Sequence, residues 1–156
     1  MKVIRVYVDT SVFGGVFDEE FQIVSRKFFK QIKEKQFALV TSAVVKEELM
    51  VAPKKVQDLF TEISKDAEIL NITEDALKLQ HSYLKAKIVP SNFSNDALHV
   101  ALATVSRCQL IVSWNFKHIV HFRKIPLYNK INVDQGYTQV GIFSPLEVIV
   151  YEEKEI

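Results

Sequence analysis

Short apolar runs alternate along this chain with longer segments whose apolar residues recur at helical spacing. The short runs are rich in β-branched and aromatic residues, which is typical of buried strands. They cover residues 4–8, 37–41, 67–72, 110–113 and 139–143. Strands that alternate with helices indicate right-handed crossovers and a sheet covered on both faces. We therefore predict an α/β fold, a three-layer α/β/α sandwich with a mostly parallel central sheet of five or so strands.

The segments between these runs predict helices. They lie at residues 19–35, 42–51, 53–65, 96–107, 127–133 and 145–149, with one more that begins at Thr73. One face of the helix after Thr73 is predicted to carry Leu77, His81, Leu84 and Ile88. The helix 96–107 is apolar on nearly every face and should lie inside the protein, with Ser94 or Asn95 as its cap.

Composition is ordinary for a soluble globular protein, with 48% hydrophobic and 25% charged residues. No internal repeat or Pro/Gly-rich linker divides the chain, so we predict a single domain over residues 1–156. Cys108 is the only cysteine, which excludes a disulfide or a cysteine-based zinc site within one chain. No apolar run reaches the roughly 18 residues of a membrane helix, and no secretory signal pattern begins the chain. We expect a cytoplasmic protein that does not associate with a membrane.

The net charge of +1, from 20 Lys and Arg against 19 Asp and Glu, gives no overall argument for nucleic-acid binding. A local excess of basic residues exists, formed by Lys117, His118, His121, Arg123, Lys124 and Lys130. This run is either a solvated loop or a surface that faces the substrate, and the sequence leaves both interpretations open.

Asp9 directly follows the first predicted strand and precedes the hydroxyl residues Thr10 and Ser11. Open α/β sheets bind ligands at the carboxyl ends of their strands, which makes Asp9 a candidate site residue. Its alternative role is to cap a following turn or helix. Gly14 and Gly15 suit a turn shortly after this motif.

Further polar residues stand at the ends or on the apolar faces of predicted elements. Glu48 falls inside the apolar arc of the helix after the second strand, and Glu47 falls at the margin of that arc. Asp96 opens the apolar helix, where an acid also stabilises the helix N-terminus. Asn115 follows the fourth predicted strand, where an ordinary turn residue is the alternative.

Asp9, Glu48 and Asp96 in a single crevice would repel one another unless a cation lies among them, because an unpaired buried charge is costly. Mg²⁺ or Mn²⁺ suits such a site, since both are hard cations that bind carboxylates, waters and substrate phosphate. A cation of this kind can activate a water and stabilise charge on a phosphoryl oxygen. The pattern therefore indicates metal-assisted chemistry on a phosphate ester.

Four stretches of the chain resemble the signature motifs of PIN domains, in the order and on the types of element found in that family. They are Tyr7-Val8-Asp9-Thr10-Ser11, Ser42 through Glu48-Leu49, Asp96-Ala97-Leu98-His99-Val100-Ala101 and Val112-Ser113-Trp114-Asn115-Phe116. PIN domains are α/β/α metal-dependent ribonucleases, and many stand-alone members of this length are toxins of VapBC toxin–antitoxin pairs. The resemblance implies a Mg²⁺- or Mn²⁺-dependent endoribonuclease with RNA as substrate, a small antitoxin protein as partner and a homodimeric state.

The resemblance also implies roles for single residues. Asp9, Glu48 and Asp96 would act in catalysis by holding the metal, with the Ser11 hydroxyl hydrogen-bonded to this set. The spacing of the family pattern favours Glu48 over the acid before it. The fourth acidic position of the pattern is Asn115 here, whose amide oxygen can bind a hard cation but adds no charge. Asn115 is therefore a candidate ligand that puts metal affinity in question.

Neighbouring residues are candidates for supporting these ligands or binding substrate. His99 either orients a metal ligand or contacts phosphate, or is simply a buried histidine on a packed helix. Lys117 and His118 are predicted to bind a substrate phosphate, and the segment 114–118 resembles a subset of PIN-like sequences. Trp114 and Phe116 are favoured as core residues over stacking on an unpaired base.

Two other functions stay open. A PIN fold with weakened catalysis would be a module that binds RNA or protein, which Asn115 and the nearly neutral charge favour. A phosphatase of the haloacid dehalogenase type also has an Asp after its first strand. That class needs a second acid two residues later, where this chain has Ser11, so the sequence disfavours it.

Overall fold

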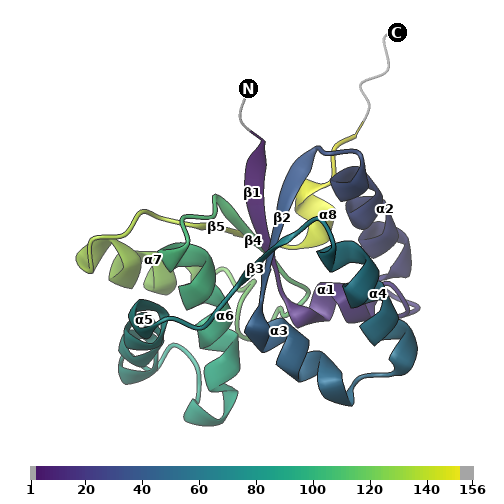
Figure 1. The fold of residues 1–156 in the computed structure, drawn as a ribbon. Coiled ribbons are helices and arrows are strands. Elements are labelled where there is room, and N and C mark those ends of the chain that lie inside the picture. Colours follow the sequence, from purple (N-terminus) through teal and green to yellow (C-terminus); the bar gives the residue numbers. More distant parts are fainter. Residues whose placement is uncertain (1–2, 152–156) are drawn as a thin grey trace, which may run out of the picture.

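The structure, a computed structural model, describes residues 3–151 and contains a five-stranded parallel sheet (Figure 1). The strands are β1 (Ile4–Val8), β2 (Phe37–Ser42), β3 (Glu68–Leu70), β4 (Leu110–Val112) and β5 (Gly141–Phe143). They lie in the order β3-β2-β1-β4-β5, and each neighbouring pair is parallel. The predicted α/β fold with a mostly parallel central sheet is confirmed.

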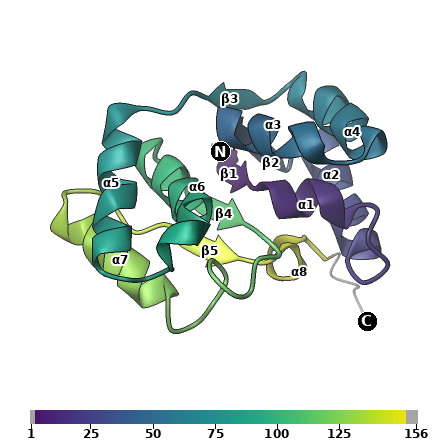
Figure 2. The same ribbon diagram turned by 90° about the horizontal axis from the view of Figure 1, so that it is seen from below.

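Helices cover both faces of the sheet, as the two ribbon views show (Figures 1 and 2). One face carries α1 (Thr10–Gly15), α2 (Gln22–Lys33), α4 (Lys54–Ser64) and α8 (Pro145–Val148). The other face carries α5 (Glu74–Lys85), α6 (Ser94–Val105) and α7 (Ile125–Asp134). The short elements are α3 (Ala43–Glu48) and the 3₁₀ helices η1 (Leu49–Val51) and η2 (Ser91–Phe93). Within residues 3–151, no helix is long and apolar enough to cross a membrane.

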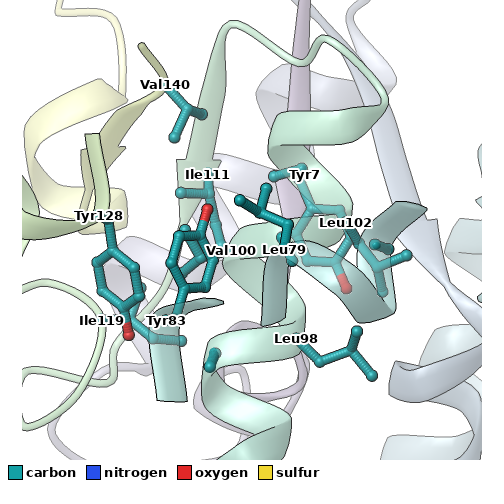
Figure 3. Packing of buried hydrophobic residues seen from close by; sticks show 14 of the residues in the cluster. Tyr7, Leu79, Tyr83, Leu98, Val100, Leu102, Ile111, Ile119, Tyr128 and Val140 are labelled. Atoms are coloured by element: carbon teal, nitrogen blue, oxygen red, sulfur yellow. The ribbon is translucent and has the colours of Figure 1, made fainter. Parts of the chain in front are cut away.

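Two apolar cores lie on opposite faces of the sheet, and β1 contributes to both. Val6 and Val8 pack with α1, α2 and α4, whereas Tyr7 packs with α5 and α6. Successive side chains of a strand point to opposite faces, so a strand buried on both sides needs a continuous apolar run. Figure 3 shows the core that contains Tyr7, where Leu79 and Leu102 surround its ring. β1 is therefore the central strand, and its carboxyl end is held firmly from both faces.

The strand order creates a switch point between β1 and β4. From β1 the chain moves outward through β2 to β3, and then returns to the other side of β1 to form β4. The connections after β1 and β4 consequently cover opposite faces of the sheet, which opens a crevice at their carboxyl ends. Asp9 follows β1 at this point, and its backbone N–H donates to Val112 O of β4 at 3.4 Å. The fold thus places the Asp9 side chain where α/β sheets bind ligands.

The predicted turn at the two glycines is wrong. Gly14 and Gly15 lie inside α1. A Cβ atom added to Gly15 would lie 2.6 Å from Ser25 Oγ and 2.8 Å from Trp114 Nε1. Gly15 is therefore needed because two other segments approach the α1 backbone closely, and not because the chain turns there.

Two helix details also differ from the predictions. Neither Ser94 nor Asn95 caps α6, because the helix follows η2 directly and already includes both residues. In α5 the predicted shared face is only partly buried, since Leu77 is 46% exposed, whereas Leu84 packs against the core and Ile88, beyond the end of α5, is buried. The residues of α5 that are buried are Ala76, Leu79 and Tyr83. The burial of α6 is confirmed: every residue from 97 to 104 is buried.

Candidate active site

Asp9 lies directly after β1 and is only 3% exposed. Two hydroxyl groups hold its carboxylate: Ser11 Oγ donates to Oδ1 at 2.6 Å, and Ser113 Oγ donates to Oδ2 at 2.6 Å. Burial raises the pKa of Asp9, although the charge of His99 and the two hydroxyls act in the opposite direction. The carboxylate is therefore well oriented, but its negative charge is incompletely compensated.

The same two serines join the loops that follow β1 and β4. Ser11 Oγ accepts a hydrogen bond from Trp114 N at 2.8 Å, and Ser113 Oγ accepts one from Asn115 N at 2.9 Å. Each serine thus donates to Asp9 and accepts from the backbone after β4. Because each hydroxyl both donates and accepts a hydrogen bond, the Asp9 carboxylate cannot rotate without disturbing the two loops.

Glu48 approaches the same crevice from the strand on the other side of β1. β2 ends at Ser42, whose hydroxyl accepts from Val45 N at 3.4 Å and so caps the start of α3. Less than two helical turns later, Glu48 has a side chain that is 29% exposed, whereas Glu47 is exposed. The capped start of α3 therefore directs Glu48, and not Glu47, toward the crevice.

Two side chains hold one oxygen of Glu48. Thr10 Oγ1 donates to Glu48 Oε1 at 2.7 Å, and His99 Nε2 donates to the same oxygen at 2.6 Å. Burial acts to raise the pKa of Glu48, but the hydrogen bond and charge of His99, together with the Thr10 hydroxyl, outweigh it and lower the pKa. Glu48 is thus an ionised carboxylate, and its hydrogen bonds within residues 3–151 leave Oε2 available for a further ligand.

His99 is only 2% exposed and connects Glu48 to the interior. Its Nδ1 lies 2.7 Å from the Tyr7 hydroxyl, which in turn lies 2.7 Å from Ser42 Oγ. Burial acts to lower the pKa of His99, but the hydrogen bond to Glu48 and the charge of Asp9 outweigh it and raise the pKa. A continuous buried path of hydrogen bonds therefore runs from the cap of α3 to the carboxylate at its other end.

Asp96 and Asn115, the other two predicted ligands, lie on neighbouring elements. Asp96 is half-buried in the first turn of α6. The Oδ1 atom of Asn115 accepts from the backbone N–H three residues later at 2.9 Å, which stabilises the loop after β4. Within residues 3–151, no three His, Cys, Asp or Glu side chains are close enough together to hold a metal ion. The hydrogen bonds of the site link Asp9, Glu48 and His99 to the surrounding hydroxyls and do not include Asp96.

A groove of about 520 Å³ opens beside Glu48. Thr10 and Ser11 line it near the carboxylates, and it extends between α1 and the start of α4 to Phe17 and Lys55. The groove is open to solvent and reaches the residues that hydrogen-bond to both carboxylates. A substrate can therefore approach the site from this side.

Lys117 and His118, the predicted phosphate-binding pair, occupy different environments. Lys117 is exposed, and its Nζ lies 5.5 Å from the centre of the Phe93 ring. His118 is only 4% exposed, its ring lies 4.4 Å from that of Phe93, and burial lowers its pKa. Tyr128 Oη also donates to His118 O at 2.7 Å. Lys117 is thus accessible to a phosphate, whereas His118 stabilises the loop from inside.

Sequence reasoning missed Tyr7, Thr10 and Ser113 as partners of the site's polar groups. A hydroxyl residue directly after a strand was the available signal for Thr10 and Ser113. Tyr7 belongs to an apolar strand, so its sequence context predicts only a core residue. Nothing local connects it with His99, which is 92 positions away.

Solved structures resemble this fold over most of the chain. VapBC2 from Rickettsia felis, bound to a DNA fragment from the promoter, is 12% identical with a TM-score of 0.61, over 90% of this chain and 98% of that chain. FitAcB from Neisseria gonorrhoeae is 16% identical with a TM-score of 0.59, over 92% and 99%. VapC20 from Mycobacterium tuberculosis, described as a toxin that cleaves the sarcin-ricin loop, is 14% identical with a TM-score of 0.57, over 87% and 98%. At these identities the likeness shows a shared fold.

Among curated proteins, none matches this chain in sequence. The sequence pattern of the PIN domain matches residues 6–119, which is most of the chain. The matched region contains Asp9, Glu48, Asp96 and Asn115, the four positions on which the resemblance was based. The shared fold agrees with the sequence match to the PIN domain. The chain belongs to the PIN domain family.

Proposed function

We propose that this protein is a metal-dependent endoribonuclease that hydrolyses RNA phosphodiester bonds, and that it is the toxin of a VapBC-type toxin–antitoxin pair. The observation that carries the proposal is that the adjacent residues Thr10 and Ser11 donate hydrogen bonds to Glu48 and Asp9, at the switch point of the sheet. Membership of the PIN family supports the nuclease class. The similar VapBC2 and VapC20 structures, the latter described as a toxin, support the assignment as a toxin.

The donor set suits Mg²⁺ or Mn²⁺. Mg²⁺ keeps several waters and is typically bound by one or two carboxylates together with substrate phosphate, so Asp9 and Glu48 are sufficient to anchor it. Both residues offer oxygen donors, and the burial that raises the pKa of Asp9 marks a charge that a cation would offset. Asp96 and Asn115 are proposed as additional ligands. When bound, the cation would activate a water and stabilise charge on a phosphoryl oxygen.

The chain's own residues prepare the carboxylates for this role. Two serine hydroxyls hold both oxygens of Asp9, while Thr10 and His99 hold one oxygen of Glu48. Partners that orient ligands in this way typically change metal affinity or activity by about 10–100-fold. The groove beside Glu48 admits the substrate, and the exposed Lys117 is proposed to bind a substrate phosphate, with His118 supporting it.

The partners proposed for the protein follow from the same assignment. The VapBC2 structure that shares its fold supports a small antitoxin protein as partner. We propose RNA as the substrate, a homodimer as the assembly and the cytoplasm as the location. Co-expression with the protein encoded next to it should relieve the growth arrest that expression of the toxin alone is expected to cause.

A cleavage assay tests the enzymatic proposal. The wild type is expected to cut a labelled single-stranded RNA in Mg²⁺ or Mn²⁺, and EDTA should abolish the cleavage. Asp9→Asn and Asp96→Asn should each lose activity. Asp134→Asn, which removes a surface carboxylate 3.2 Å from Lys130 Nζ, is the matched control and should cleave normally.

Metal binding provides a readout that does not depend on cleavage. Titration calorimetry with Mn²⁺ should show binding to the wild type and to Asp134→Asn, and weaker binding to Asp9→Asn. Cleavage that survives EDTA, or that is equal in the wild type and Asp9→Asn, would contradict the metal-dependent mechanism.

One observation favours a second candidate function. The Asn115 amide oxygen already accepts a hydrogen bond from His118 N at 2.9 Å, and the residue adds no negative charge to the site. This arrangement suits a PIN fold that binds RNA or a protein with weak or no nuclease activity. Binding of RNA by the wild type without cleavage in either metal would select this alternative.

A further inference from the structure

Four aromatic side chains lie next to the active site, around the loop that follows β4. Trp114 stacks on Phe21 with ring centres 4.3 Å apart, and Phe116 lies 6.1 Å from Trp114. Further along the loop, Lys117 Nζ lies 5.5 Å from the centre of the Phe93 ring. We call Phe21, Phe93, Trp114 and Phe116 the aromatic surface.

Two members of the aromatic surface are open to solvent. Phe93 is 38% exposed. Phe116 is 49% exposed, so its predicted place in the core is wrong. Below Phe116, the Trp114 indole is fixed, since its Nε1 donates to Ser25 Oγ at 2.8 Å and Gly15 packs closely against it. An exposed ring beside a fixed one offers a flat apolar face in a defined position. Unpaired bases stack on rings of this kind.

The charge around the aromatic surface favours a polyanion. Asp96, three positions after Phe93, is acidic, but from there to residue 133 the chain contains no further Asp or Glu and has five Lys or Arg residues. Of these, Lys117 and Arg123 are exposed in the loop after β4. At the Phe21 end, three acidic residues at 18–20 precede the ring. A phosphate backbone is therefore favoured near Lys117 and disfavoured near Phe21, which orients a bound strand.

The aromatic surface is also continuous with the catalytic carboxylate. Ser113 Oγ donates to Asp9, and the next residue, Trp114, donates its backbone N–H to Ser11 Oγ. Phe116 follows Ser113 by three positions. A polynucleotide with one phosphate at Asp9 would therefore have neighbouring bases close to the aromatic surface.

We propose that the aromatic surface, together with Lys117, binds unpaired bases of single-stranded RNA beside the scissile phosphate. The inference rests on the proposed ribonuclease function and specifies which residues contact the bases beside the scissile phosphate. In a duplex the base faces are stacked inside and cannot contact Phe116, whereas in a single strand they are free. Every base has a flat face, so the surface selects unpaired RNA over duplex and does not select a sequence.

Binding measurements in the Asp9→Asn background test this without cleavage of the probe. By fluorescence anisotropy, a short labelled RNA of mixed sequence should bind at least about tenfold more tightly as a single strand than when annealed to its complement. Phe116→Ala should weaken single-strand binding about tenfold, the effect of losing one stacked base, and Phe116→Trp should preserve it. Lys117→Ala should lower the slope of log K against log salt by about 0.7.

A second lysine–aromatic pair provides the matched control. Lys27 Nζ lies 4.8 Å from the centre of the Tyr151 ring, which is 60% exposed. Lys27 lies in α2, and Gln31 of the same helix donates to the backbone oxygen of Val150 at 2.8 Å, near the start of β2 and so at the opposite end of the sheet from Asp9. Tyr151→Ala and Lys27→Ala remove the same chemistry and should leave RNA affinity and its salt dependence unchanged. Thermal melting of each variant verifies that it is folded, and Lys117→Ala tests the surface independently of Phe116.

The outcomes separate this inference from the proposed function. Duplex RNA that binds as tightly as the single strand would overturn the inference, as would Phe116→Ala binding like Tyr151→Ala. If the wild type still cleaves RNA in that case, the ribonuclease proposal stands without the aromatic surface. Binding that depends on Phe116 in a wild type that cuts no RNA would support the surface and overturn the nuclease.

Discussion

The two sides of the site differ in how firmly the protein holds their polar groups. On the side of β1 and α3, Asp9 and Glu48 receive hydrogen bonds from three hydroxyls and a histidine, all between 2.6 and 2.7 Å. On the side of α6 and the β4 loop, Asp96 lies in the first turn of α6 and Asn115 stabilises a backbone turn. The fold therefore orients the carboxylates of Asp9 and Glu48 through contacts between distant segments. The positions of Asp96 and Asn115 depend instead on the helix and the loop to which each belongs.

The largest effect should come from the comparison of Asp9→Asn with Asp96→Asn. Partners that only orient a ligand change activity by about 10–100-fold, so loss of the anchoring carboxylate Asp9 should reduce cleavage by more than about 100-fold. Asp96→Asn should also reduce it, but by less, because Asp96 lies outside the hydrogen-bonded group. Single-turnover cleavage rates at saturating Mn²⁺ measure both. A larger loss in Asp96→Asn would reverse the comparison and make α6 the main metal-binding element.

A smaller effect is expected from Tyr7→Phe, which breaks the path behind Glu48. The change leaves His99 Nδ1 and Ser42 Oγ without their common partner in a buried setting, which should cost about 1–3 kcal/mol of unfolding free energy. It should also reduce cleavage about tenfold, because His99 then holds Glu48 less firmly. Urea unfolding and cleavage rates give the two values.

Tyr83→Phe is the matched control for that prediction. Tyr83 is also fully buried, and its hydroxyl donates to Asn132 Oδ1 in the core between α5 and α7, away from the carboxylates. It should lose a similar amount of stability and keep full activity. Equal losses of activity in both variants would mean that the path from Tyr7 to Glu48 has no special role in orienting the carboxylate.

The firm side of the site was only partly predictable from the sequence. The position of Asp9 could be predicted, because the run Ile4–Val8 indicates a buried strand and the residue after it must lie at the edge of the sheet. Helical spacing also predicts Glu48, and not Glu47, on the apolar arc of its helix, and the structure has Glu48 half-buried and Glu47 exposed. These features depend on local periodicity and capping, which the sequence carries directly.

The features that could not be predicted depend on contacts between distant segments. In α5, Leu77 and Leu79 belong to two apolar faces, and only packing against α6 decides that Leu79 is the buried one. Gly15 has a turn-like sequence context, but its role is set by Ser25 and Trp114, which approach it from other segments. The hydroxyl partners of the carboxylates follow the same rule, since they come from strands that become neighbours only in the fold.

Substitution of the two glycines of α1 should affect stability alone, and it tests whether contacts between distant segments decide the role of Gly15. Gly15→Ala places a Cβ atom against Ser25 Oγ and Trp114 Nε1, and should cost about 1–3 kcal/mol because the overpacked segments must shift. Gly14→Ala meets no atom within 4 Å and should stabilise the helix by about 0.5–1 kcal/mol. Chemical denaturation measures both values. A stabilised Gly15→Ala would mean that α1 and the Trp114 loop are not held together as the structure has them.

The smallest effect concerns pH and the buried histidine. The folded protein raises the pKa of His99 above its ordinary value of 6.5, so the stabilisation by its charged form is complete below that pH and is lost as pH rises through the folded pKa. In EDTA, the unfolding free energy of the wild type should therefore fall above pH 6.5 more steeply than that of His99→Gln. His81→Gln, at an exposed position of α5, should follow the wild type. Parallel profiles for the wild type and His99→Gln would show that His99 holds Glu48 as a neutral donor, and that the firm side of the site keeps both carboxylates together without a positive charge between them.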